Sequence, residues 1–194
     1  ATHFIDRSID SLHSYSYSVR AMIGEHSRQA SESASIQPVV ELMDDRDPRV
    51  QYGPAFHNWE DADLFAGTEK YADLTVDSYS DNDATARISF NGRGIEIYGL
   101  KSSELGLAEV QIDGKKVGDL DFHTSGEMEK SALIGRFTGL PDGEHLLTLT
   151  VKKEHLNRGN ERSKISIDYF KIYPGQGATV EKMDDRDSRI HYGS

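Results

Sequence analysis

The amino-acid sequence predicts an all-β protein, a β-sandwich of the jelly-roll type, with an α-helical segment ahead of it. From residue 39 onward, short stretches alternate apolar and polar residues, which is the period of a strand with one buried face. Asn-Gly and Asp-Gly pairs stand between several of these stretches, as they do in tight hairpins. The stretches follow at even spacing without a helical pattern among them, and this is typical of a sandwich.

The segment 1–38 differs from the rest because its apolar residues recur at helical spacing. The residues on this stripe are Ile5, Ile9, Leu12, Val19 and Ile23. A serine-rich run at 27–35 weakens the pattern, and Pro38 ends it. An amphipathic helix needs a surface against which to bury its stripe. We interpret the segment as a helical connector from a preceding domain, the alternative being a helix that binds a dedicated partner.

The strands of the predicted sandwich are bounded by turn residues. The first clear pair surrounds Asn-Gly-Arg-Gly at 91–94, and the second surrounds Asp113-Gly114. A Leu-Pro-Asp-Gly turn at 140–143 and Pro174-Gly175 mark two further boundaries. The strands are expected at 84–90, 95–98, 107–112, 117–122, 132–137, 145–151 and 165–173. With less regular stretches included, about nine or ten strands are expected between 39 and 175.

One stretch of the chain occurs twice. Residues 40–53 return as residues 180–193, with ten of fourteen positions identical. A period of 140 residues is a whole-domain repeat, because solenoid units are only ~20–50 residues long. The sequence therefore predicts a complete module at 39–175, followed at 176–194 by a linker and the start of a second copy.

The charge of the chain bears on its partners. A formal net charge of −11 argues against a nucleic-acid partner, which requires a basic face. No apolar run is long enough to span a bilayer, so membrane insertion is not expected. Cysteine is absent, which excludes disulfides and thiolate metal sites.

The predicted strands carry motifs that resemble a known family. In chain order they are Asp-Asp-Arg-Asp-Pro-Arg-Val-X-Tyr at 44–52, Gly-Thr-X-X-Tyr at 67–71, Gly-Ile-X-Ile-Tyr-Gly at 94–99, Gly-X-Ala-X-Val-X-Ile-Asp-Gly at 106–114 and Gly-Leu-Pro-Asp-Gly-Glu-His at 139–145. This series resembles the galactose-binding-like β-sandwich modules appended to secreted bacterial glycoside hydrolases, the calcium-containing jelly-roll type of carbohydrate-binding module. The resemblance implies a noncatalytic, extracellular or cell-surface module that binds glycan beside neighbouring domains of its own polypeptide.

Sugar recognition needs an aromatic face for the CH groups of a pyranose and polar groups for its hydroxyls. Trp59, the only tryptophan, lies between His57, Asn58 and Glu60 in a polar stretch expected to be a loop. The alternative is that Trp59 folds back as a lid over the sandwich core. Secondary candidates in other predicted loops are Tyr79, Lys101, Glu104, Asn157 and Arg158.

The dense acidic motif that begins at Asp44 has two explanations. In the resembling modules, acidic groups of the first strand and an aspartate of the last strand commonly hold a structural calcium, and the matching positions are Glu41, Asp44 and Asp168. The alternative is that Arg46 and Arg49 pair with the aspartates and lock a strand corner without any ion.

No catalytic residue can be named from the sequence. The eight histidines form no metal-ligating pair at helical spacing, and neither a nucleophile elbow nor a phosphate-binding glycine loop is present. His145, at the start of a predicted strand, is explained as a hydrogen-bonded sheet histidine. The expected function is therefore glycan binding beside a larger enzyme, the alternative being a structural spacer or protein-docking sandwich without sugar binding.

Overall fold

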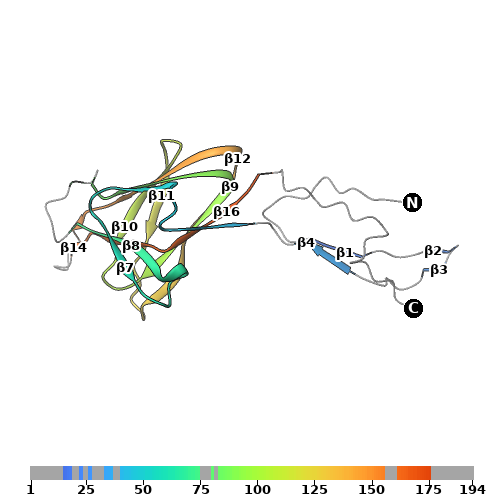
Figure 1. Cartoon of the computed structure of the whole chain (residues 1–194), viewed down its shortest axis with the longest axis horizontal. Coiled ribbons are helices and arrows are strands. Elements are labelled where there is room, and N and C mark those ends of the chain that lie inside the picture. The colour runs from blue at the N-terminus through green and yellow to red at the C-terminus, as the bar shows by residue number, and fades with distance from the viewer. Residues whose placement is uncertain are drawn as a thin grey trace.

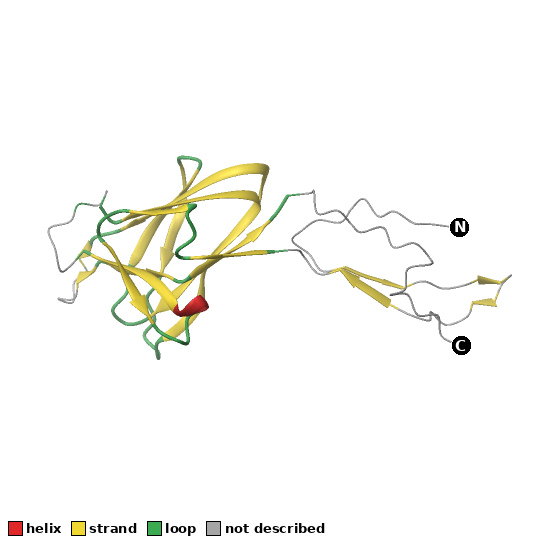
Figure 2. Cartoon of the chain, in the orientation of Figure 1, coloured by secondary structure: helices red, strands yellow, loops and turns green. Residues whose placement is uncertain are grey.

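The computed structural model describes residues 15–18, 22–23, 26–27, 33–36, 40–74, 80, 83–155 and 161–175. Most of these residues are in β-strands, and their one helical element is the short 3-10 helix η1 (Phe65–Gly67). The all-β class predicted from the alternating stretches is therefore confirmed (Figure 2). Among the described residues, no helix has the length and apolar character needed to cross a membrane.

A seven-stranded sheet makes up the larger layer (Figure 1). Its strands, in pairing order, are β11 (Lys115–Asp121), β10 (Leu107–Ile112), β12 (Glu129–Val151), β9 (Thr85–Lys101), β16 (Tyr169–Tyr173) and β5 (Glu41–Asp44). The seventh strand, β6 (Val50–Tyr52), pairs with β9 near its beginning. All these pairs are antiparallel, so one face can pack on the core while the other meets solvent.

A three-stranded antiparallel sheet makes up the second layer. Its strands are β15 (Lys164–Ile167), β8 (Thr68–Asp73) and β7 (Phe56–Glu60). β15 and β16 are separated only by Asp168, so the chain passes from the small sheet to the large one at this residue. The expected strand at 165–173 therefore exists as two strands that belong to different sheets.

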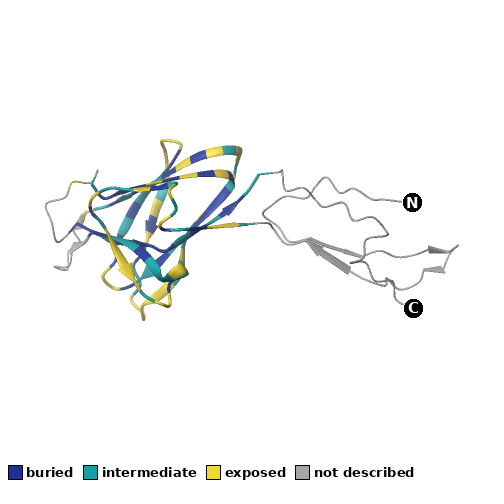
Figure 3. Cartoon of the chain, in the orientation of Figure 1, coloured by how far each residue is buried: buried dark blue, intermediate teal, exposed yellow. Residues whose placement is uncertain are grey.

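The hydrophobic core joins the two sheets into one cluster. Ile95 and Ile97 of the large sheet and Ile165 and Ile167 of the small sheet are all 0% exposed members of it. Buried residues alternate with more exposed ones along β10 and the first half of β9, whereas residues 94–97 of β9 are all buried (Figure 3). Because alternate residues point to opposite faces, each sheet buries one face against the other sheet.

Some predicted turns are confirmed and others are wrong. Asp113 and Gly114 have φ values of 53° and 76° and join β10 to β11, as their Asp-Gly sequence predicts. The predicted turn at 91–94 instead continues within β9. Gly92 is needed there because a Cβ would lie 2.3 Å from the carbonyl oxygen of Tyr173. The predicted turn at 140–143 is an irregularity within β12, where the pairing with β9 shifts between Thr138 and Gly143.

Four short strands are described in the segment 1–38, where the sequence predicts a helix. β1 (Tyr15–Ser18) pairs with β4 (Ser33–Ile36), and β2 (Met22–Ile23) pairs with β3 (His26–Ser27). The described residues of this segment are thus extended. The rest of the predicted helix, and the linker and second copy at 176–194, lie outside the described residues.

Candidate functional site

An aromatic surface lies on the edge strand of the small sheet. Residues 56–60, predicted to be part of a loop, form β7, and its register places His57 opposite Tyr71 and Trp59 opposite Glu69. The ring centroids of His57 and Tyr71 are 5.5 Å apart, and Trp59 meets Tyr71 edge-on at 6.3 Å. Trp59 is 54% exposed, so it is not a lid on the core. We call His57, Trp59 and Tyr71 the Trp59 surface.

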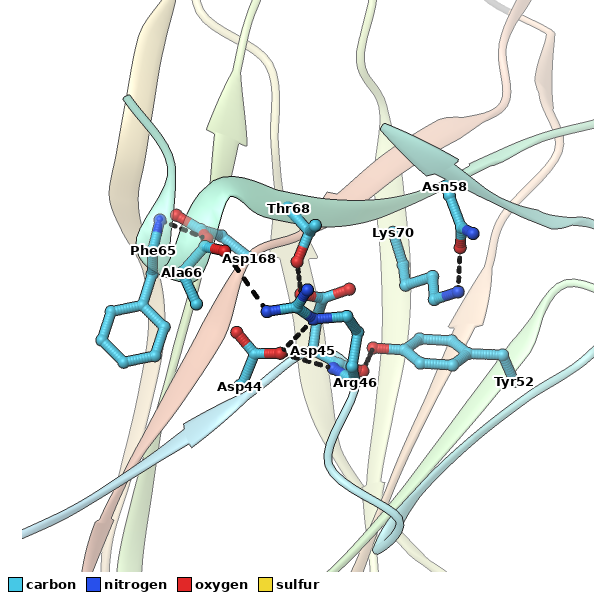
Figure 4. A network of polar contacts seen from close by, with 10 residues as sticks. All are labelled: Asp44, Asp45, Arg46, Tyr52, Asn58, Phe65, Ala66, Thr68, Lys70 and Asp168. Carbon is cyan, nitrogen blue, oxygen red and sulfur yellow. Dashed lines mark hydrogen bonds and ion pairs between the residues drawn. The ribbon is translucent and has the colours of Figure 1, made fainter. Parts of the chain in front are cut away.

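Asn58 points to the opposite face of β7, because side chains alternate along a strand. Its Oδ1 accepts a hydrogen bond from Lys70 Nζ, and the same ammonium lies 5.5 Å from the ring centroid of Tyr52 (Figure 4). The three sugar-binding candidates at 57–59 therefore lie on two different faces of β7. Asn58 is turned toward the β5–β6 corner, whereas His57 and Trp59 are turned outward.

The other sugar-binding candidates are placed as follows. Lys101 ends β9 opposite Glu129 of β12, and Glu104 is exposed in the following turn. The part that either residue plays in sugar binding stays a prediction. Tyr79, Asn157 and Arg158 lie outside the described residues.

Three carboxylates gather where the chain changes sheets. The backbone of Asp45 donates a hydrogen bond to the Asp168 carbonyl at 3.1 Å, and Asp44 pairs in register with Tyr169. Asp168 is 0% exposed; its Oδ1 accepts the Phe65 N–H at 3.0 Å and its Oδ2 accepts the Ser131 hydroxyl at 2.5 Å. We call Asp44, Asp45 and Asp168 the acidic cluster (Figure 4).

The electrostatics of the acidic cluster are unfavourable. Burial raises the pKa of Asp45, and the neighbouring Asp44 charge raises it further despite a hydrogen bond from Thr68 Oγ1 at 2.7 Å. Burial likewise raises the pKa of Asp168, to which Asp45 and Asp44 add. The pKa of the nearby Glu69 is raised by burial and by Asp168 and Asp45. Buried like charges of this kind require a compensating cation or a proton.

Two oxygens of the cluster lack any hydrogen-bond partner in the described part of the chain. They are Asp44 Oδ2 and Asp45 Oδ2, and both are buried. An orphaned buried carboxylate oxygen costs about 1–3 kcal/mol or more, and hard oxygens of this type are what calcium prefers. The donor set thus fits a cation chemically. Within the described ranges, however, no three or more His, Asp or Glu side chains are placed so that they could hold a metal ion together.

Two strained residues border Asp168. Ala66 and Ser131 are non-glycine residues with φ values of 50° and 49°. Ser131 donates to Asp168 through its hydroxyl, and Ala66 follows Phe65, whose N–H donates to the same carboxylate. Such backbone strain is found at sites that the surrounding structure holds in place.

The arginine pairing weighed from the sequence is present. Arg46 Nε binds Asp44 Oδ1 at 2.7 Å, and its Nη2 reaches the Ala66 carbonyl at 3.3 Å. Arg49 Nη2 binds Asp47 Oδ2 at 2.8 Å and Glu41 Oε1 at 2.5 Å. Glu41, a predicted calcium ligand, is therefore engaged with Arg49. These pairs leave the second oxygen of Asp44 and that of Asp45 unsatisfied.

Sequence reasoning missed several residues of the site. Tyr71 and Lys70 alternate on β8 and complete the two faces of β7, which only the cross-strand register shows. Asp45 lies in the acidic motif but is not among the calcium ligands that the resemblance implies, although it is only 1% exposed. A strand pattern at 68–73 beside the tryptophan stretch is the one signal that could have pointed to Tyr71.

The sequence of the chain is similar to segments of two larger enzymes. No model of a protein family matches it. It is 24% identical over 170 residues to the A type blood alpha-D-galactosamine galactosaminidase of Flavonifractor plautii, a match that covers 85% of the chain and 14% of that enzyme. It is 26% identical over 112 residues to the A type blood N-acetyl-alpha-D-galactosamine deacetylase of the same organism, with 58% and 13% covered.

Solved structures with some similarity include parts of two glycan-related proteins. One is the CBM36-1 domain of a multidomain xylanase from the hindgut metagenome of Trinervitermes trinervoides, at 14% identity and a TM-score of 0.41, with 69% of this chain and 95% of that chain covered. Another is Paenibacillus xanthan lyase, at 18% identity and a TM-score of 0.44, with 62% and 12% covered. The chain is thus an all-β domain that is similar in sequence to small parts of two glycan-active enzymes.

Proposed function

We propose that residues 39–175 are a noncatalytic carbohydrate-binding module of a larger, secreted glycan-active enzyme, which the module holds at polysaccharide or host glycan. The observation that carries this proposal is the Trp59 surface. An exposed indole ring beside Tyr71 offers an apolar face for the CH groups of a sugar, while His57 supplies a polar edge. A weak site of this kind still raises the effective concentration of a linked enzyme at its substrate.

The sequence similarities support a glycan ligand and suggest which to test first. The two enzymes are named for galactosamine and N-acetylgalactosamine in the A-type blood group antigen, and the chain spans only 14% and 13% of their lengths. A segment of that size suits an accessory domain. Galactosamine-containing glycans are therefore the first ligand class to examine.

The test is calorimetric titration of the intact chain with the A-type antigen oligosaccharide, galactosamine and N-acetylgalactosamine. We expect wild-type protein to bind at least one of them and Trp59→Ala to lose that binding while its thermal unfolding midpoint changes little. Leu146→Ala, which truncates a 39% exposed apolar residue on β12, is the matched control and should bind normally. Absence of binding to any glycan would favour the structural spacer instead.

We also propose that the acidic cluster holds a structural calcium ion. Asp44, Asp45 and Asp168 would be the carboxylates that hold it, because two of them present orphaned buried oxygens and all three repel one another. When bound, calcium would supply positive charge that offsets this repulsion. Asp45 thus takes the place given from the sequence to Glu41, which pairs with Arg49.

A further inference from the structure

The outward face of the large sheet carries a second set of aromatic and charged side chains. The Trp59 surface lies on the other sheet. Ile95, Ile97, Phe170 and Ile172 face the core, so the residues that alternate with them face away from it. These residues, which we call the tyrosine face, are Glu96 and Tyr98 of β9, Arg136 of β12, and Tyr169, Lys171 and Tyr173 of β16.

Two of the three tyrosines of this face, Tyr98 and Tyr169, are partly exposed, whereas Tyr173 is buried at 8% exposure. Tyr98 and Tyr169 are cross-strand neighbours whose rings stack at 4.4 Å with 7° between their planes. Phe65 of η1 lies 4.7 Å from Tyr169 and extends the row. Leu133 lies opposite Tyr98 and is 40% exposed, so apolar surface continues outward from the rings.

A buried carboxylate fixes the geometry of this face. Glu96 is 0% exposed and accepts hydrogen bonds from Tyr98 at 2.7 Å, from Tyr173 at 2.8 Å and from Arg136 Nε at 2.5 Å. Burial would raise the pKa of Glu96, but these bonds outweigh it and lower the pKa, so Glu96 stays ionised. The bonds hold the two tyrosines and the guanidinium in one arrangement before any ligand arrives.

The tyrosine face carries more positive than negative side chains. Lys171, Glu96 and Arg136 are direct neighbours across three strands, which gives two cations to one carboxylate in a chain of net charge −11. Arg136 meets Glu96 through Nε and its side chain is 58% exposed, which leaves the outer part of the guanidinium accessible. Lys171 Nζ lies 5.9 Å from the ring centroid of Tyr173. Strands are ~4.8 Å apart, so the backbones that carry Lys171 and Arg136, two strands apart, are separated by about 10 Å, the span of one or two sugar rings.

We propose that the tyrosine face is a second glycan-binding site, specific for an acidic sugar that carries a carboxylate or a sulfate group. Guanidinium and ammonium groups bind such anions through charge-assisted hydrogen bonds, and the guanidinium can bind bidentately. The tyrosine rings and Leu133 supply the apolar surface for the sugar ring itself. Because the chain has a net charge of −11, a polyanion is expected to bind only where cations are locally in excess, as they are here.

The experiment is titration of the intact chain with polygalacturonate, dextran sulfate and uncharged dextran. We expect binding to at least one of the two anionic polymers, and which of them binds tells carboxylate from sulfate recognition. Lys171→Gln should weaken this binding about tenfold, the loss expected for one charge-assisted hydrogen bond. Arg136→Lys, which keeps the charge beside Glu96 but loses the planar group, should weaken it too. Binding should fade at about 1 M salt, where the screening length is about 3 Å.

Two controls keep the result specific. Lys115→Gln removes the same charge from exposed β11 and should bind like wild type. Trp59→Ala should also retain binding to the anionic polymer, so this site and the Trp59 surface can fail separately. Equal loss in Lys171→Gln and Lys115→Gln, equal binding of dextran, or binding of neither anionic polymer would overturn the proposal. Thermal unfolding of each variant verifies that it is folded.

Discussion

Two hydrogen-bond acceptors, one on each ring nitrogen, set the charge of the His145 imidazole. His145 is 8% exposed, with Nδ1 2.7 Å from Asp113 Oδ2 and Nε2 2.8 Å from the Pro141 carbonyl. Because neither partner can donate, both ring nitrogens donate, and the ring is most stable as the imidazolium. Burial would lower the pKa of His145, but the bonds to Pro141 and Asp113 outweigh it and raise the pKa. The sheet histidine expected from the sequence is confirmed.

This geometry predicts how stability changes with pH. The folded pKa of His145 lies above its unfolded value of about 6.5, so its stabilisation is complete below that pH and is lost as pH rises through the folded pKa. We expect the urea midpoint of wild type to fall over this range and that of His145→Gln to change less. The measurement is a series of urea titrations followed by circular dichroism. Identical pH dependence in the two proteins would contradict the assignment.

The carboxylates of the acidic cluster also make the fold less stable as pH rises, because their folded pKa values are raised too, but here the charged form is the unfavourable one. A carboxylate whose folded pKa is raised destabilises the fold above that pKa, and protonation relieves this as pH falls. With calcium removed by a chelator at neutral pH, Asp45→Asn should therefore melt at a higher temperature than wild type, because the substitution removes one buried charge.

Calcium should reverse this difference, so that wild type melts at a higher temperature than Asp45→Asn. At a calcium concentration one hundred times Kd, binding stabilises wild type by about 2.7 kcal/mol, which raises the melting temperature by about 5–10 °C. Asp45→Asn should gain much less. Asp47→Asn is the control, since Asp47 pairs with Arg49 rather than facing the cluster. A wild-type melting temperature that is indifferent to calcium would disprove the calcium site.

At the scale of the strands, β9 and β15 approach each other unusually closely. A Cβ at Gly99 would lie 2.3 Å from the carbonyl oxygen of Ser166, and the N–H of Leu100 donates to Ser166 Oγ at 3.0 Å. The Ser166 hydroxyl in turn donates to Glu69 at 2.5 Å. Through Ser166, the contact thus connects Leu100 of the large sheet to the buried Glu69 of the small sheet.

Gly99→Ala should therefore destabilise the protein by about 1–3 kcal/mol, the usual cost of overpacking. The neighbouring atoms are backbone and cannot rotate away. Gly126→Ala is the matched control, because its Cβ would meet only Thr124 Oγ1 at 3.5 Å. Free energies of unfolding from denaturant titrations compare the two. Equal stabilities of the variants would show that β9 and β15 can separate at little cost.

The strand pattern of the sequence predicted element type better than element limits. Alternation identified β10 and much of β9, since the period of a half-buried strand is a local property. The glycines at 92 and 143 suggest turns from the local sequence, but Gly92 permits a close approach to Tyr173, a residue distant in sequence. Residues 56–60 were expected to be a loop because they are polar, and an edge strand with little burial is equally polar. Which side chains share a face then depends on register, which composition does not contain.

At the scale of the whole molecule, the two sheets share one hydrophobic cluster. Trp59 is the only tryptophan and lies on the small sheet, whereas most strand residues belong to the large sheet. Its fluorescence and the far-ultraviolet circular dichroism therefore report on different layers. A single core makes their unfolding cooperative.

We accordingly expect both signals to give the same midpoint and the same denaturant dependence. The measurement is a single urea titration observed by both methods on the same samples. Trp59→Phe, followed by circular dichroism alone, checks that the indole itself does not alter the midpoint. Two separate transitions would mean that the small sheet unfolds on its own, against the shared core.

The pairing of β5 with β16 has a mechanical consequence. The two strands are antiparallel, and Glu41 lies opposite Ile172, so the flanking segments leave the module at the same end. Tension between those segments would peel β5 from β16 one hydrogen bond after another, rather than shearing all of them at once. A module stretched between its two flanking segments would therefore yield at low force, with its first strand as the weak point.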